Sequence, residues 1–567
     1  MQPVGPVRPL QWLGVALEWV CVAGALVVGA WLRFGRLDLL EFKGDEALAL
    51  HLAAKLAHGS GPVWAGLMSS VKVTNPPLFI YLLAPLVWIE SDPAFISCCI
   101  AALNLGAVAL CWHIGRKYYG RLAGAVAALL FAVSPWAVIY SRKIWAQDLV
   151  PVFATGALWA LHVLVLDRRP KAIFWVLLLP LCLIQIHFSG LALTAMILAL
   201  LWLLRPQVDW PRVKAAVAVA ALLLIPYLWF QVQTGGADFR QALATLGGQQ
   251  YRIPDDLRVD PRLGYAYPRR DSWVHAVAIV NAGEIEDILG LSARWVLDPQ
   301  RVWPATCPRA QYFRETQGLE NPLLWLEQIA LVAAWGWLAV RAARGLRVAR
   351  RKPFASVPAD APVQTALILT LWIAVPVAVF VAARLWTYLS YFVILLPAEF
   401  LALGIGVQEL LAKVKKQPKV PGLVVTLVAA VAVANVVFLT DLNNFLDRYG
   451  GAHGAYGTTL ANKQAAADRL AERVDVAALM RDKRLWQMDR PGELERARLD
   501  VVWLASQRPV TVPRGDWSNT TVIVMDRNRT TVSARAYEEW RQAVSAHELG
   551  RAEFGPMRLI FLGGRLE

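Results

Sequence analysis

Residues 12–32 read WLGVALEWVCVAGALVVGAWL, an apolar run that only Glu18 interrupts. A helix of about 20 such residues crosses the hydrocarbon core of a bilayer. No small-residue cleavage site follows, so the run predicts a retained first membrane helix rather than a removed signal peptide. The composition agrees, because 57% of the 567 residues are hydrophobic and only 17% are charged. We therefore expect a polytopic α-helical membrane protein.

Further apolar segments of similar length follow along the chain, and together they predict about eleven transmembrane helices. The segment 76–89 is treated differently because it is short and contains three prolines, which favours an interfacial or re-entrant helix in the first outer loop. The expected spans after the first are 94–115, 122–140, 149–166, 172–186, 188–204, 213–232, 322–340, 363–383, 391–411 and 421–440.

Basic residues gather in alternate loops between these spans, which accounts for the net charge of +15. Under the positive-inside rule these loops face the cytoplasm. The N-terminus is then cytoplasmic and the C-terminal tail extracytoplasmic, in a protein that we expect in the plasma (inner) membrane. No basic-aromatic module suggests a nucleic-acid partner. The clusters are Arg116, Lys117 and Arg121; Arg168, Arg169 and Lys171; Arg205, Arg212 and Lys214; Arg341 to Lys352; and Lys413 to Lys419.

Composition divides the chain into four predicted parts. These are an N-terminal catalytic membrane module over 1–232 with its outer loop at 33–93, an outer loop or cap over 233–321, C-terminal transmembrane helices over 322–441, and a small extracytoplasmic α/β domain over 442–567. The cap has a helical pattern over 271–291. The last part predicts a helix over 459–474 and buried strands at 499–504, 520–525 and 558–562.

The stretch Leu40-Glu41-Phe42-Lys43-Gly44-Asp45-Glu46-Ala47 in the first outer loop contains adjacent carboxylates. Two interpretations of Asp45 and Glu46 are open. In the first, one of the two carboxylates acts as a general base on a hydroxyl acceptor. In the second, the acidic pair favours the start of the helix that follows. A capped helix start also holds a carboxylate in position, so the two interpretations are compatible.

Other polar residues fall at the outer ends of predicted spans, where charged groups are functional candidates. Arg142 and Lys143 suit a lipid phosphate, although both, with Asp148, also fit the roles of interfacial anchors and a helix cap. A divalent metal between Asp45, Asp148 and His187 is an alternative role for these residues, and no other cofactor is predicted. The remaining outer-face candidates are Arg384, Tyr388 and Tyr391, which also suit an aromatic belt.

Several motifs together resemble the C-type glycosyltransferases of the protein O-mannosyltransferase and lipid A aminoarabinose transferase kind. They are Gly44-Asp45-Glu46, Asn75-Pro76-Pro77-Leu78-Phe79-Ile80-Tyr81, Ser134-Pro135 and the turn from Ser141-Arg142 to Asp148. The resemblance covers 12–230, with a weaker echo at 388–397. It implies an enzyme that takes a sugar from a polyprenyl-phosphate carrier on the outer face. It also implies that Asp45 is the base, with Glu46 beside it, and that Asp148 is a second acidic site residue.

One position departs from the pattern, because the family often has Lys or His before Pro-Pro and this chain has Asn75. A phosphate contact would then come from Lys72, or from Arg142 and Lys143. The predicted function is inverting transfer of a glycosyl group to a hydroxyl-bearing lipid, glycan or protein. The alternative is a transporter or a flippase for lipid-linked sugars, which the chain supports less well because its halves show no matched broken helices.

Overall fold

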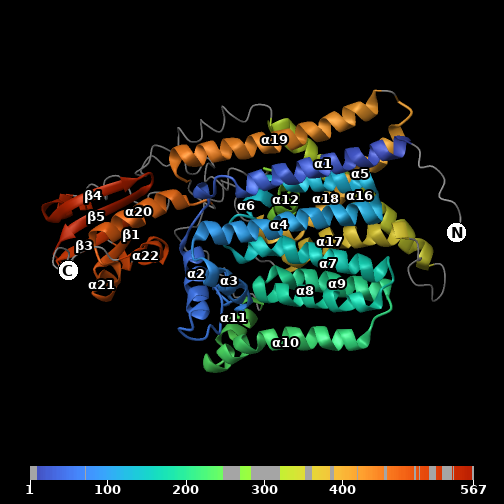
Figure 1. The fold of residues 1–567 in the computed structure, drawn as a ribbon. Helices are drawn as coiled ribbons and strands as arrows, with labels where there is room; N and C mark the ends of the chain where they lie inside the picture. The colour runs from blue at the N-terminus through green and yellow to red at the C-terminus, as the bar shows by residue number, and fades with distance from the viewer. Residues whose placement is uncertain are drawn as a thin grey trace.

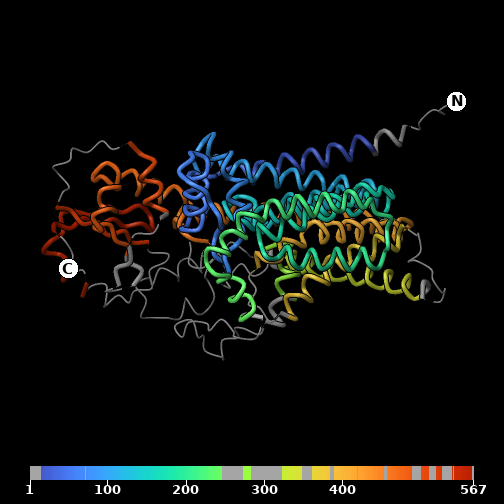
Figure 2. Tube along the Cα trace, turned by 90° about the horizontal axis from the view of Figure 1, so that it is seen from below, coloured from blue at the N-terminus to red at the C-terminus, as the bar shows by residue number. Residues whose placement is uncertain are grey.

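The computed structural model describes residues 9–69, 72–246, 268–282, 320–350, 361–383, 389–417, 419–451, 456–490, 493–496, 499–509, 519–526, 539–540 and 542–564. Long helices run side by side in a bundle, and a small unit of helices and strands adjoins one end of it (Figure 1). The helices α2 and α3 of the first loop lie at that same end (Figures 1 and 2). We call it the domain end of the bundle.

The described part of the bundle contains seven helical segments that are long and apolar enough to cross a membrane. They are Val15–Phe34, Pro93–Tyr119, Ala146–Val165, Trp210–Gln233, Pro322–Arg347, Ala361–Ala382 and Val420–Tyr449. The protein is therefore an integral membrane protein with a mostly helical fold. The expected count of eleven spans is not confirmed. The predicted runs 122–140, 172–186 and 188–204 form shorter helices, and the run 391–411 forms a 3-10 turn followed by the 19-residue helix Leu396–Val414, which is not among the seven.

The helices of the first half are α1 (Pro9–Phe34), η1 (Leu37–Leu39), α2 (Gly44–Ala57), α3 (Leu78–Ile89), α4 (Pro93–Ile114), η2 (Gly115–Tyr119), α5 (Arg121–Val133), α6 (Pro135–Ile139), η3 (Ala146–Leu149), α7 (Val150–Val165), η4 (Pro170–Ala172), α8 (Ile173–Ile186), α9 (Ser189–Leu204), α10 (Trp210–Gln233) and α11 (Ala237–Leu246). The later ones in the bundle are α12 (Pro268–Ala278), α16 (Glu320–Arg350), α17 (Ala361–Ala383), η7 (Leu389–Ile394), α18 (Leu396–Val414) and α19 (Val420–Tyr449).

The predicted span 122–140 is broken into α5 and α6 at Ser134-Pro135. Proline has no backbone N–H and is tolerated at the first turn of a helix, so it begins α6 while α5 ends before it. The fully buried Arg33 guanidinium donates to the carbonyl oxygens of Ala132 at 2.6 Å and Phe131 at 3.3 Å. These are carbonyls at the end of α5, which would otherwise lack partners.

The packing of α5 against α18 depends on one glycine. A Cβ atom on Gly404 would overlap the backbone carbonyl of Ala123, so the two helices approach backbone to backbone. Phe131 and Phe400 stack nearby with ring centroids 5.0 Å apart. Glu18, which also lies in α1, forms an ion pair through Oε1 with Arg116 at 2.7 Å.

The C-terminal unit, from α20 to β5, has a five-stranded sheet in the order β2-β1-β3-β5-β4. Strands β1 and β3 are parallel, and the other neighbours are antiparallel. Its elements are α20 (Leu460–Arg473), α21 (Val476–Arg481), β1 (Leu485–Arg490), β2 (Glu493–Arg496), α22 (Leu499–Ser506), β3 (Thr520–Asp526), η8 (Ser545–His547), β4 (Glu548–Phe554) and β5 (Met557–Gly563).

The sequence predicted α20, β3 and β5 close to their observed bounds. The expected strand over 499–504 is wrong, because those residues form α22. A short apolar run fits a buried helix as well as a buried strand. The helix expected over 271–291 is present as α12, which ends at Ala278, and 283–291 lies outside the described residues. The division of the chain at 232, 321 and 441 stays a prediction.

Candidate functional site

The loop that follows α1 pairs with the segment before α20 at the domain end of the bundle. Residues 40–42 run antiparallel to 458–460, with a bridge between Glu41 and Thr459. The N–H of Leu460 donates to the Leu40 carbonyl at 2.8 Å. These backbone bonds place the acidic stretch of the first loop against the C-terminal unit.

A buried charge cluster forms where the two segments meet. The Glu41 carboxylate, which is fully buried, binds the ammonium groups of Lys43 and Lys143 and accepts the backbone N–H of Gly457. Burial acts to raise the pKa of Glu41, but the two ammonium groups outweigh it and hold that pKa below its ordinary value. Glu41 is therefore a buried anion shared by two cations.

Lys143 is enclosed by aromatic rings. Its Nζ lies 4.5 Å from the ring centroid of Trp145, 5.3 Å from that of Tyr456 and 5.7 Å from that of Tyr140. Burial acts to lower the pKa of Lys143, while the adjacent Glu41 raises it further than burial lowers it. The ammonium thus stays charged inside a cage of π-faces, which favour a cation. The Lys43 side chain is 21% exposed and carries the positive charge of the cluster toward solvent.

Glu46 caps α2, as the second interpretation of the acidic stretch expected. Its Oε2 accepts the backbone N–H of Lys43 at 3.0 Å, and its Oε1 is buried without a partner among the described residues. Burial and the nearby Glu41 raise the pKa of Glu46 to about 7. Asp45, by contrast, is exposed. Among the described residues no hydrogen bond or ion pair engages its carboxylate.

The Asp148 carboxylate stabilises the turn that contains Lys143. Its Oδ2 accepts the backbone N–H of Lys143 at 2.7 Å, and its backbone carbonyl accepts from Asn104 Nδ2 at 2.8 Å. The side chain is fully buried, and Oδ1 has no partner within the described part of the chain. The structure therefore joins Asp148 to Lys143, but by a backbone contact rather than an ion pair.

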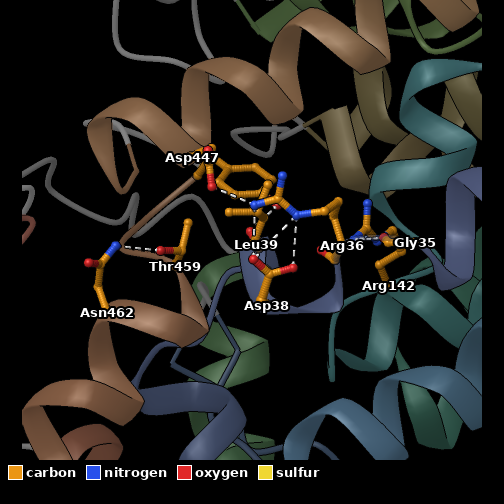
Figure 3. A network of polar contacts seen from close by, with 9 residues as sticks. Gly35, Arg36, Asp38, Leu39, Arg142, Asp447, Thr459 and Asn462 are labelled. Atoms are coloured by element: carbon orange, nitrogen blue, oxygen red, sulfur yellow. Dashed lines mark hydrogen bonds and ion pairs between the residues drawn. The ribbon is translucent and has the colours of Figure 1, made fainter.

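Arg142 binds the backbone just after the end of α1. Its guanidinium donates to the carbonyl oxygens of Gly35 at 2.7 Å and Arg36 at 2.6 Å (Figure 3). Arg36 in turn binds Asp38 at 3.0 Å and Asp447, at the end of α19, at 2.5 Å (Figure 3). These contacts connect the loop after α1 to the last turns of α19.

The remaining predicted residues lie apart from the cluster or outside the described residues. His187 Nδ1 is 2.8 Å from Ser189 Oγ, and its ring centroid is 5.3 Å from that of Tyr391. Asn75 is held in its own loop, where Nδ2 donates to the Leu67 carbonyl at 3.0 Å. Lys72 is exposed at a left-handed turn with φ of 58°. Arg384 and Tyr388 fall outside the described residues.

A metal site between Asp45, Asp148 and His187 is not assembled, since the described residues contain no group of three or more His, Cys, Asp or Glu that could hold an ion. Glu41, Lys43 and Gly457 were not predicted from the sequence as site residues. Both Glu41 and Lys43 lie in the acidic stretch 40–47, but no feature of the local sequence marks them as site residues. Gly457 is 416 residues from the carboxylate it binds.

No protein-family model and no curated protein match the sequence. Among solved structures, the chain is similar to ArnT from Cupriavidus metallidurans in the apo state, with a TM-score of 0.48 and 11% identity over 96% of this chain and 98% of ArnT. It is also similar to ArnT bound to undecaprenyl phosphate, with a TM-score of 0.47 and 11% identity over 98% of both chains.

A third similar structure is the Archaeoglobus fulgidus oligosaccharyltransferase in the apo form, with a TM-score of 0.47 and 14% identity over 88% of this chain and 60% of that one. ArnT is a lipid A aminoarabinose transferase.

Proposed function

We propose that the protein is a glycosyltransferase that moves a sugar from a polyprenyl-phosphate carrier to a hydroxyl-bearing acceptor on the extracytoplasmic face of the plasma (inner) membrane. The observation that carries the proposal is the charge cluster of Lys43, Lys143 and Glu41 beside the exposed Asp45. The sequence motifs that resemble C-type glycosyltransferases support the same assignment.

The cluster carries the positive charge that stabilises a phosphate leaving group. Two ammonium groups share the Glu41 carboxylate, so the group of three is positive overall. Lys43 is its solvent-reaching cation and is our candidate for the direct phosphate contact. A preorganised cation placed where negative charge develops lowers the barrier to the displacement. Because the leaving group already bears a phosphate, the reaction needs no nucleotide.

Asp45 is our candidate for the general base. It occupies the first turn of α2, and its exposed carboxylate is accessible to an incoming acceptor. In the proposed step, Asp45 takes the proton of the acceptor hydroxyl as the acceptor oxygen bonds to the anomeric carbon. The bond from that carbon to the phosphate oxygen breaks, and the polyprenyl phosphate leaves with the electron pair. A single displacement inverts the anomeric centre.

The buried carboxylates have supporting roles in this proposal. Glu46 holds the start of α2 through the Lys43 N–H, and Asp148 holds the turn that carries Lys143. Both therefore position groups of the site without contacting the substrate. Arg142 is assigned to the same supporting role, since its guanidinium binds the backbone at the end of α1.

The test measures sugar transfer by the purified full-length protein from a panel of radiolabelled polyprenyl-phosphate sugars. Asp45→Asn is expected to lower the rate by about a hundred- to ten-thousand-fold, the range typical for loss of a general base. Glu90→Gln is the matched control, because Glu90 is another exposed carboxylate, at the end of α3. Full transfer by Asp45→Asn would exclude that base. Movement of lipid-linked sugar across vesicles without any transfer would favour the flippase alternative.

A further inference from the structure

The segment 456–460 links the core of the C-terminal unit to the charge cluster. Gly457 donates its backbone N–H to Glu41, and the Tyr456 hydroxyl donates to the Leu39 carbonyl at 2.9 Å. The Tyr456 ring is also one wall of the cage around Lys143. The C-terminal unit thus contributes both a hydrogen bond and an aromatic face to a site whose charged groups come from the membrane module.

Position 457 requires glycine because of its neighbours. A Cβ atom there would lie 2.7 Å from Lys43 Cε and 3.1 Å from Glu41 Oε1. The φ of Gly457 is not positive, so alanine fits the backbone and the conflict is with these side chains alone. Because Lys43 is flexible, a methyl group at this position would displace its ammonium rather than unfold the segment.

The segment is also anchored on its other side. Thr458 Oγ1 donates to Asp526 Oδ1 at 2.6 Å. Asp526 lies 3.6 Å from the ammonium of Lys463, which is fully buried and binds Asp500 at 2.6 Å. Buried hydrogen bonds and ion pairs of this kind restrict the positions of the groups that they join. The position of Gly457 is therefore set by the interior of the C-terminal unit.

We propose that Gly457 is a positioning residue through which the C-terminal unit holds Glu41 and Lys43 in the geometry that binds the phosphate of the lipid carrier. The inference rests on the proposed function. It adds that the membrane module alone forms an incomplete site. The N–H of Gly457 fixes the carboxylate, the carboxylate fixes both ammonium groups, and the absence of a side chain leaves room for the Lys43 stem.

The experiment measures binding of polyprenyl phosphate, without a sugar, to the full-length protein in detergent, together with the melting temperature. Gly457→Ala is expected to raise the Kd at least about five-fold while the melting temperature stays unchanged. Gly550→Ala is the matched control, since Gly550 lies in β4 and a Cβ there would meet only Arg473, at 3.8 Å. The control is expected to leave both quantities unchanged.

An unchanged Kd in Gly457→Ala would overturn the inference. If Gly457→Ala lowers the melting temperature, the comparison of Thr458→Val with Thr458→Ser decides the question instead. Valine removes the hydroxyl that binds Asp526 and serine keeps it, so the valine variant is expected to bind polyprenyl phosphate more weakly than the serine variant. Equal affinities of those two variants would also overturn the inference. Failure of the wild type to bind polyprenyl phosphate would instead count against the proposed function.

Discussion

Glu46 is expected to make the stability of the protein depend on pH, and Glu46→Gln is expected to remove that dependence. Burial and the adjacent Glu41 raise the pKa of Glu46 from 4.5 to about 7 in the folded protein. The folded protein then holds a proton that the unfolded chain releases. This contribution to stability is fully present below pH 4.5 and is lost as the pH rises through 7.

The size of the effect follows from the two pKa values. One pH unit corresponds to about 1.4 kcal/mol, so the separation between 4.5 and about 7 corresponds to about 3 kcal/mol in total. About 2 kcal/mol of this is lost between pH 5 and pH 7. Glutamine keeps an oxygen that can accept the Lys43 N–H and cannot ionise. Relative to the wild type, the variant should therefore gain about 2 kcal/mol in free energy of unfolding over that interval.

The assay is chemical unfolding in detergent at pH values from 5 to 8, with the wild type and Glu46→Gln measured in parallel. Only the difference between the two proteins is interpreted, because other groups titrate in both. Asp45→Asn is the control, since it removes the neighbouring carboxylate from an exposed position. A difference between wild type and Glu46→Gln that stays constant from pH 5 to 8 would refute the reasoning.

Two further predictions concern buried ion pairs. Glu41→Gln is expected to cost about 3–5 kcal/mol, because it removes the carboxylate that pairs with the buried ammonium of Lys143. Adding Lys143→Met should restore part of that loss, and strictly additive effects in the double-mutant cycle would contradict the coupling. Lys463→Met should cost a similar amount, about 3–5 kcal/mol, by leaving Asp500 and Asp526 buried together. This destabilisation is measured by amide hydrogen exchange in β3, and unchanged protection of those amides would count against the prediction.

The helical membrane fold could be predicted from the sequence because its signals are local. Apolar length is a property of each segment taken alone, so α1, α4, α10 and α19 fell close to their observed positions. The predictions of helix and strand failed where contacts with neighbouring segments determine the conformation. The break at Ser134 depends on Pro135 and on how the freed carbonyls are satisfied by Arg33. Likewise, nothing within 499–504 distinguishes the observed helix from a strand.

The candidate site could be predicted only in part. The acidic stretch and the turn after Tyr140 were both singled out, and the structure brings Lys143 and Asp148 together in that turn. Their partners could not be predicted, because Glu41 meets Lys143 and Gly457 only through long-range folding. The two adjacent carboxylates also differ in burial, because Asp45 is exposed and Glu46 is buried. A pair of neighbours in sequence carries no information about that difference.

The bond between Glu41 and Gly457 has a consequence for how the protein is made. Lys143 follows Glu41 by 102 residues, whereas Gly457 follows it by 416. At about 5–20 residues per second, the ribosome delivers Gly457 between about 20 and 80 s after Glu41. The ion pair therefore forms early in synthesis and its final hydrogen bond forms late. A nascent chain that does not yet include Gly457 leaves Glu41 without this hydrogen bond, so the charge cluster is complete only after the C-terminal unit has begun to be synthesised.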